Sequence, residues 1–95
     1  MQIPSIDVER IKNGVVRASR IPGYDPAYVV VYFGGWVQHP YSLGLIVFRK
    51  DDEYFVLYFG DNEEDGVIPE RWQNLKQVSR EQAADHAEAM EDYFE

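Results

Sequence analysis

Three segments in the middle of the chain combine β-branched with aromatic residues and end at Gly, Pro or Asp, a pattern typical of β-strands. They are Tyr28–Phe33, Leu43–Arg49 and Tyr54–Phe59. Only the polar residues 50–53 separate the last two, which predicts a tight hairpin. With Lys50 facing Glu53, the expected cross-strand pairs are Phe48 with Phe55, Val47 with Val56 and Ile46 with Leu57.

The N-terminal part of the chain allows two interpretations. Ser5 or Asp7 is a suitable cap for a short helix that ends at Asn13-Gly14, where glycine is a common stop. The same Asn-Gly pair also fits a two-residue turn between strands at 6–12 and 15–21. That hairpin would mix charged and apolar side chains on both sides, which favours the helix. Val15–Ile21 is then expected to form a strand.

The C-terminal part of the chain predicts helices. Residues 61–66 form an acidic loop, and Pro69 fits the first turn of a short helix whose apolar stripe is Trp72, Leu75 and Val78. Ser79 and Gln82 have the spacing of a capping box, which opens a helix expected to run to about Phe94. Residues 67–95 are therefore predicted to be helical.

These elements predict a single α+β domain over residues 1–95. Its first part, 1–14, is a short helix or a first strand, and residues 15–60 form an antiparallel sheet of about four strands. The C-terminal amphipathic helix is expected to pack on one face of this sheet.

Alternation along the strands separates two apolar faces. The first face has no polar side-chain atom, and we expect the C-terminal helix to cover it. The second face carries tyrosines and one arginine. It is either buried by the N-terminal segment or by curling of the sheet into a small barrel, or it is a contact surface for another protein or a second copy of the chain. The first face comprises Val29, Val31, Phe33, Ile46, Phe48, Phe55, Leu57 and Phe59. The second comprises Tyr28, Val30, Tyr32, Leu45, Val47, Arg49, Tyr54, Val56 and Tyr58, of which Tyr28, Tyr32, Arg49, Tyr54 and Tyr58 are the candidate contact residues.

Composition narrows the class of protein. The 95 residues include no cysteine, are 45% hydrophobic and carry a net charge of −8. A core is therefore available without disulfides, and direct binding to nucleic acid or to an anionic membrane is disfavoured. No apolar run is long enough to span a membrane, and the start of the chain does not read as a signal peptide, so we expect a cytoplasmic protein.

The negative charge is concentrated in the second half of the chain. Residues 1–50 contain six bases and three acids, whereas residues 51–95 contain three bases and 14 acids. On the predicted C-terminal helix, Ala83, Ala87, Met90 and Phe94 share one side and a stripe of acids lies opposite. Like charges at this spacing, and acids in a last helical turn, oppose helix stability. The acidic candidates are Asp61, Glu63, Glu64 and Asp65 in the loop and Glu81, Asp85, Glu88, Asp92 and Glu95 on the helix.

This acidic stripe suggests a basic protein partner, because repeated carboxylates on a rigid element can imitate a phosphate track. The sequence therefore indicates a non-enzymatic protein-binding module of bacterial or phage type, with the size and charge of DNA-mimic inhibitors, anti-restriction or anti-CRISPR-like proteins and immunity proteins. No motif assigns it to a family. The alternative is a homodimer, or a subunit of a complex, that assembles through the tyrosine-rich face.

The motifs for metal binding and catalysis are incomplete. Residues 61–68 resemble part of a calcium loop, but Trp72 stands where the bidentate glutamate is needed and a strand precedes the loop. His39 and His86 have no spacing for a zinc site, and no serine is paired with a base. We therefore expect no metal, no cofactor and no enzymatic activity.

Overall fold

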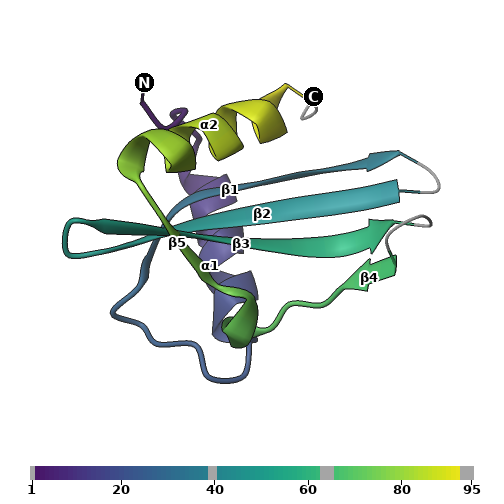
Figure 1. Ribbon diagram of the computed structural model, residues 1–95, viewed down its shortest axis with the longest axis horizontal. Coiled ribbons are helices and arrows are strands. Elements are labelled where there is room, and N and C mark those ends of the chain that lie inside the picture. The colour runs from purple at the N-terminus through teal and green to yellow at the C-terminus, as the bar shows by residue number, and fades with distance from the viewer. Residues whose placement is uncertain (1, 39–40, 63–65, 93–95) are drawn as a thin grey trace.

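The computed structural model describes residues 2–38, 41–62 and 66–92. In chain order its elements are α1 (Val8–Ser19), β1 (Val29–Gln38), β2 (Tyr41–Lys50), β3 (Glu53–Asn62), β4 (Gly66–Ile68), a 3₁₀ turn η1 (Trp72–Asn74), β5 (Lys76–Val78) and α2 (Arg80–Glu91). The strands form one antiparallel sheet in the order β1-β2-β3-β4 (Figure 1). Both β4 and β5 pair with β3: β4 pairs with the end of β3 and β5 with its beginning. The predicted α+β class is confirmed.

The central hairpin has the predicted register. Lys50 pairs with Glu53, and Phe48, Val47 and Ile46 pair with Phe55, Val56 and Leu57. Asp51 has a φ of 55° in the turn, a left-handed conformation that Asp adopts more readily than most residues. The apolar pattern and the polar turn therefore specify this hairpin together.

The N-terminal helix is longer than predicted, and the expected strand at Val15–Ile21 is wrong. Asp7 caps α1 by accepting a hydrogen bond from the Arg10 amide, and the helix continues through Asn13-Gly14 to Ser19. Gly14 is buried against β1, where an added Cβ would lie 2.7 Å from the Phe33 Cβ. This glycine permits close packing of the helix and does not end it.

A β-bulge in β1 changes which side chains share a face. Val30 pairs with Phe48 and Tyr32 pairs with Val47, so Val31 is the extra residue of the bulge. Val30 and Tyr28 therefore pack with the Phe48 side of the sheet, whereas Val31 packs with the Tyr32 side. The predicted grouping of Tyr28 with Tyr32 is wrong for this reason, and Val29 is half-exposed.

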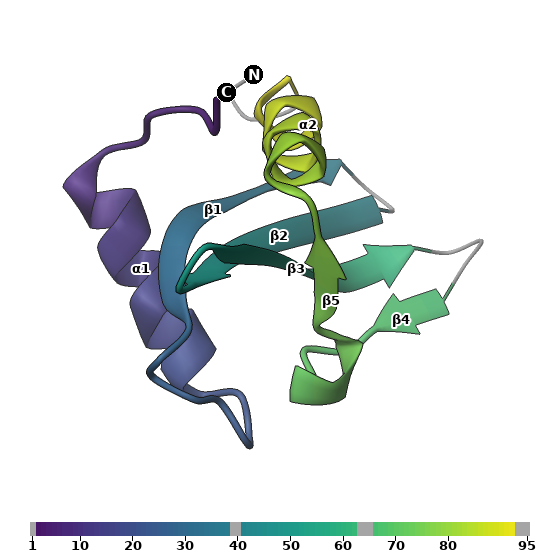
Figure 2. The same ribbon diagram turned by 60° about the vertical axis from the view of Figure 1, so that its left-hand side comes forward.

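The two helices cover opposite faces of the sheet, which reverses the predicted place of the C-terminal helix. Residues of α2 pack on the Tyr32 face, against Leu45, Val47 and Val56. Ala18 of α1 and the following Ile21 pack on the Phe48 face (Figure 2). Each face thus has its own apolar cluster, and the sheet forms the middle layer.

The segment before α2 is extended where a helix was predicted. Pro69 precedes a single 3₁₀ turn, and the short strands β4 and β5 lie on either side of it. Trp72 packs edge-on against Tyr24, Tyr28 and Phe48, so its side chain closes the Phe48 cluster. In the described part of the chain, no helix is long and apolar enough to cross a membrane.

Candidate protein-binding surfaces

Helix α2 is fixed to the sheet by its small residues. The predicted capping box is present: the Ser79 hydroxyl accepts from the Gln82 amide, and the Gln82 side chain accepts from the Ser79 amide. Ala83, Ala87 and Met90 are buried on the Tyr32 face. Alanine side chains let the helix backbone approach the sheet closely, so its opposite side points away from the core.

The outer side of α2 carries the described part of the acidic stripe. Glu81, Asp85 and Asp92 are exposed and Glu88 is half-buried. Among the residues that the structure describes, none of these four carboxylates has an ion-pair partner. At about 1.5 Å per residue they span roughly 16 Å of helix. Glu95 and Phe94 lie outside the described residues.

The acidic loop is only partly placed. Asp61 is exposed on β3, and its amide donates a hydrogen bond to the Ser42 hydroxyl. Glu63, Glu64 and Asp65 lie outside the described residues. In Figures 1 and 2 the β3–β4 end of the sheet lies away from α2. Asp61 and the acids of α2 therefore belong to separate surfaces.

The tyrosine-rich face is covered within one copy of the chain. Tyr32 is 0% exposed, and Tyr54 and Tyr58 are half-buried in the cluster that α2 covers. The Tyr58 hydroxyl oxygen lies 2.6 Å from Nδ1 of His86 on α2, and burial raises the pKa of Tyr58. Arg49 is exposed. The five candidate contact residues do not form one open surface.

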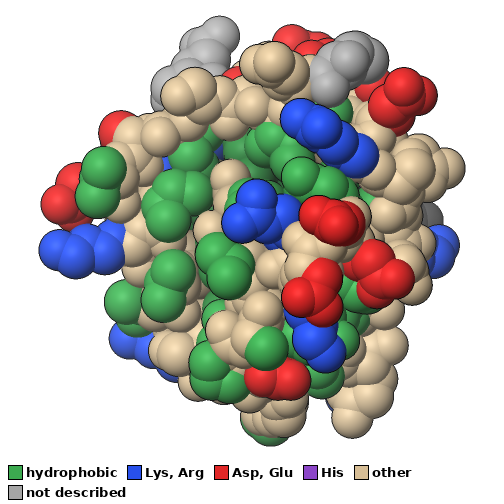
Figure 3. All heavy atoms as spheres, turned by 90° about the vertical axis from the view of Figure 1, so that its left-hand side faces the viewer, with side chains coloured by type: hydrophobic (Ala, Val, Ile, Leu, Met, Phe, Trp, Pro, Cys, Tyr) green, Lys and Arg blue, Asp and Glu red, His purple; other side chains and the backbone are tan. Residues whose placement is uncertain are grey.

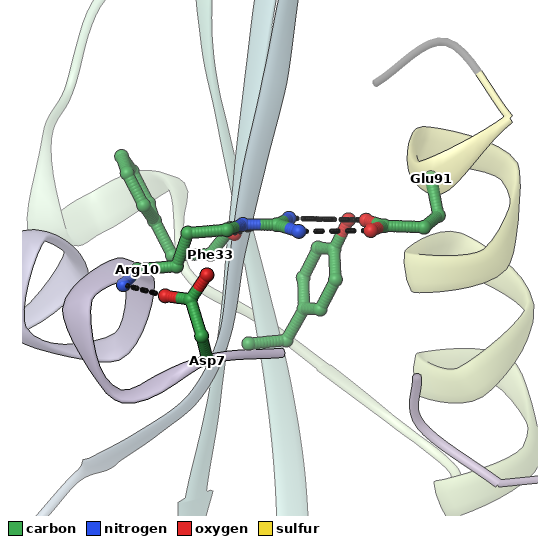
Figure 4. Close-up of polar contacts among 5 residues, drawn as sticks. Asp7, Arg10, Phe33 and Glu91 are labelled. Atoms are coloured by element: carbon green, nitrogen blue, oxygen red, sulfur yellow. Dashed lines mark hydrogen bonds and ion pairs between the residues drawn. The ribbon is translucent and has the colours of Figure 1, made fainter. Parts of the chain in front are cut away.

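A polar cluster that the sequence did not reveal connects the helices around β1 (Figure 4). The Arg10 guanidinium on α1 donates two hydrogen bonds to the Glu91 carboxylate on α2, at 2.8 and 3.0 Å. It also donates to the Phe33 carbonyl of β1 at 2.8 and 3.1 Å. The Tyr32 hydroxyl donates to Glu91 at 2.5 Å. One arginine thus joins both helices and the edge strand.

The electrostatics of this cluster match its geometry. Hydrogen bonding from Arg10 to the ionised carboxylate holds the pKa of Glu91 below its usual value. Burial, followed by the hydrogen bond and charge of Glu91, raises the pKa of Tyr32, so its hydroxyl keeps its proton and acts as a donor. The cluster therefore fixes α2 through charge-assisted hydrogen bonds.

A groove of about 560 Å³ lies between α1 and the β3–β4 end of the sheet. Phe33 and Phe59 stack at 6.4 Å on its floor, and an added Cβ at Gly44 would overlap the Phe59 ring. Arg17 lies 4.3 Å above the Phe59 ring and is held by Glu70. The groove's arginine is therefore already paired with Glu70, and the other described charged side chain that lines the groove is Asp61.

The described residues contain no group of three or more His, Cys, Asp or Glu side chains that could hold a metal ion. His86 lies against Tyr58, and His39 is outside the described residues. The chain matches no protein-family model, no curated protein and no solved structure, so the geometry of these surfaces carries the functional interpretation.

Proposed function

We propose that this chain is a non-enzymatic protein-binding module that docks the acidic outer side of α2 on a basic surface of a nucleic-acid-handling protein, and so inhibits or neutralises it. The observation that carries the proposal is the row of four carboxylates, Glu81, Asp85, Glu88 and Asp92, without ion-pair partners among the described residues. Unpaired carboxylates are available to a cationic partner without breaking an internal contact.

The row is mounted rigidly, which favours binding because less side-chain and backbone freedom is lost on association. The capping box fixes the start of α2, and buried Ala83, Ala87 and Met90 fix its inner side. Near its end, Glu91 turns inward to Arg10 while Asp92 stays exposed. The pairing of Glu91 with Arg10, beside the exposed Asp92, supports assigning the binding role to the row and not to Glu91.

Electrostatics supports a partner of opposite charge. A chain of net charge −8 is attracted to basic surfaces at long range, and this attraction is screened within about 8 Å at physiological ionic strength. The predicted loop acids Glu63, Glu64 and Asp65 would add to this attraction. The tyrosine-rich face offers no comparable surface, because α2 covers it and Tyr32 is 0% exposed.

The proposal is tested by reversing charge on α2. Asp85→Lys combined with Asp92→Lys changes two exposed positions of the row. The matched control is Asp52→Lys with Glu53→Lys, which makes the same change in net charge at the exposed β2–β3 turn, away from α2 in Figure 1. Both variants and the unmodified chain are used as bait in pull-downs from the source cell at low and high salt.

We expect the unmodified chain and the β2–β3 turn variant to retain a nucleic-acid-handling protein at low salt and to lose most of it at high salt. The α2 variant should retain it at least tenfold less at low salt. Equal capture by all three baits, or capture independent of salt, would contradict the proposal.

A further inference from the structure

The groove between α1 and the β3–β4 end of the sheet is open because glycines replace larger residues on three neighbouring strands. They are Gly35 of β1, Gly44 of β2 and Gly60 of β3. Gly35 pairs with Gly44, and Gly44 pairs with Phe59, so these residues form one row across the sheet. The three atoms nearest to an added Cβ at Gly35 would all be backbone atoms of β2. Glycine inside a strand often marks a place where a ligand approaches closely, so we expect an occupant above Gly35.

The floor of the groove is aromatic and partly open. Phe59 is 8% exposed, whereas the Phe33 ring that stacks with it is only half-buried. Val67, which is 71% exposed, and Ile68 line the groove from β4. Its volume of about 560 Å³ lies within the range of about 300–1,000 Å³ that small-molecule sites occupy. The groove can therefore take a planar apolar ring against Phe33.

The charges that line the groove favour a cation. Arg17 and Glu70 bind each other, so their charges cancel. Asp61 is exposed, and its carboxylate has no ion-pair partner among the residues that the structure describes. The opposite end of the sheet, around the β2–β3 turn, differs because acidic and basic side chains lie together among hydrophobic ones there (Figure 3). The described lining of the groove thus combines an apolar floor with one uncompensated negative charge.

We propose that this groove binds a small organic cation, a compound that carries a planar aromatic ring and a protonated amine. The ring lies against Phe33 and above Gly35, and the amine donates a hydrogen bond to the Asp61 carboxylate. Burial of the ring alone would accept any aromatic compound, so Asp61 supplies the selectivity by attracting a cation and repelling an anion. Helix α2 packs on the opposite face of the sheet, so this site is separate from the acidic row of the proposed function.

Three probes that share one ring test the role of charge at about pH 7. Phenethylamine is a cation there, phenethyl alcohol is neutral and phenylpropanoate is an anion. Each probe is titrated into the isotope-labelled chain and followed by amide NMR spectra. We expect phenethylamine to shift the amides of Phe33, Gly35, Gly44 and Gly60, with a dissociation constant on the order of 1 mM for so small a compound. Phenethyl alcohol should bind about fivefold more weakly and phenylpropanoate about tenfold more weakly.

Two variants test Asp61 itself, both at exposed positions where the fold should tolerate the change. Asp61→Asn removes the charge and keeps the shape of the side chain. Val67→Lys places an ammonium group directly opposite Asp61 on the neighbouring strand, where it should occupy the carboxylate in place of the ligand. Each should weaken phenethylamine binding about tenfold. Asp52→Asn, the matched change of charge at the β2–β3 turn, should leave the affinity within about twofold, as should Asp85→Lys with Asp92→Lys on α2.

Four outcomes would overturn the proposal. They are no amide shifts in the groove with phenethylamine at about 10 mM, equal affinity for the three probes, tighter binding of phenylpropanoate than of phenethylamine, and equal weakening by Asp61→Asn and Asp52→Asn. Tighter binding of the anion would assign the groove to Arg17 and not to Asp61. A loss of affinity in the α2 variant alone would place the cation on the acidic row, so this result also separates failure of the groove site from failure of the proposed function.

Discussion

The Arg10–Glu91 pair offers a quantitative test of how the two helices are held together. Arg10→Met keeps an apolar stem of similar length and removes the guanidinium, and Glu91→Gln keeps the shape and removes the charge. Neither change removes the acceptor that Tyr32 needs, because the glutamine side chain also has a carbonyl oxygen. A double-mutant cycle on these two positions therefore isolates the ion pair.

The exposure of the pair sets the expected magnitude. The Arg10 and Glu91 side chains are 17% and 32% exposed, so the pair is neither fully exposed nor fully buried. A surface ion pair contributes about 0–1 kcal/mol, and disrupting a buried pair costs about 3–5 kcal/mol, so we expect a value between these. We expect Glu91→Gln to lower the free energy of unfolding by about 1–2 kcal/mol. Arg10→Met should lower it by about 2–3 kcal/mol, since it also removes the donors to the Phe33 carbonyl.

Urea denaturation followed by circular dichroism measures these free energies by linear extrapolation. The double variant should lose less stability than the two single variants together, with a coupling of about 1 kcal/mol. A coupling below about 0.3 kcal/mol would show that the pair does not hold α2 to α1.

The same pair gives a pH dependence of known sign. Because Arg10 lowers the pKa of Glu91 in the folded chain from its ordinary value of 4.5, the pair stabilises the fold above that value. The stabilisation is lost as the pH falls through the lowered pKa of the folded state. The difference in unfolding free energy between the unmodified chain and Glu91→Gln should therefore be largest near pH 7 and disappear in acid. If the difference in unfolding free energy stayed constant down to about pH 3, which lies below the usual pKa of a carboxyl group, the ion pair would not be the source of this stability.

Three further substitutions test the packing and termini of the helices, all by urea denaturation. Gly14→Ala should destabilise by about 1–2 kcal/mol, because overlap with Phe33 outweighs the usual gain of about 0.5–1 kcal/mol in a helix; a net gain would show that α1 can move outward. Ser79→Ala should cost about 1 kcal/mol through loss of the capping box, whereas Ser5→Ala, outside any helix, should cost almost nothing. Asp92→Lys should raise the free energy of unfolding by about 0.3–1 kcal/mol, since an acid at the end of α2 opposes the helix dipole. An unchanged free energy of unfolding would show that solvent and salt screen this interaction completely.

Local patterns predicted the parts of the fold that depend on neighbouring residues. The polar turn at 50–53 and the flanking apolar pairs defined the β2–β3 register, and Ser79 with Gln82 defined the start of α2. The acidic outer side of α2 also followed from helical spacing alone. In each case the determining contacts lie within one hairpin or one helical turn.

The remaining features depend on contacts between distant residues. The bulge at Val31 places both Tyr28 and Val30 on the Phe48 face of the sheet and not on the predicted Tyr32 face. No residue near the bulge indicates this insertion in the sequence. The pair Asn13-Gly14 is a typical signal for the end of a helix. Only the contact of Gly14 with Phe33 explains why α1 continues through it. Arg10 and Glu91 are 81 positions apart, so the cluster that fixes α2 has no signature in the sequence.

The contact between Arg10 and the Phe33 carbonyl has a consequence for aggregation. Strand β1 is at one edge of the sheet, and an open edge can pair with a strand of another molecule and start β-aggregates. Two guanidinium hydrogen bonds occupy this carbonyl, and the Glu91 carboxylate holds the guanidinium in place. Any strand that added here would first have to displace an ion pair. The residue that ties the two helices together therefore also blocks strand addition at Phe33, at one point of the β1 edge.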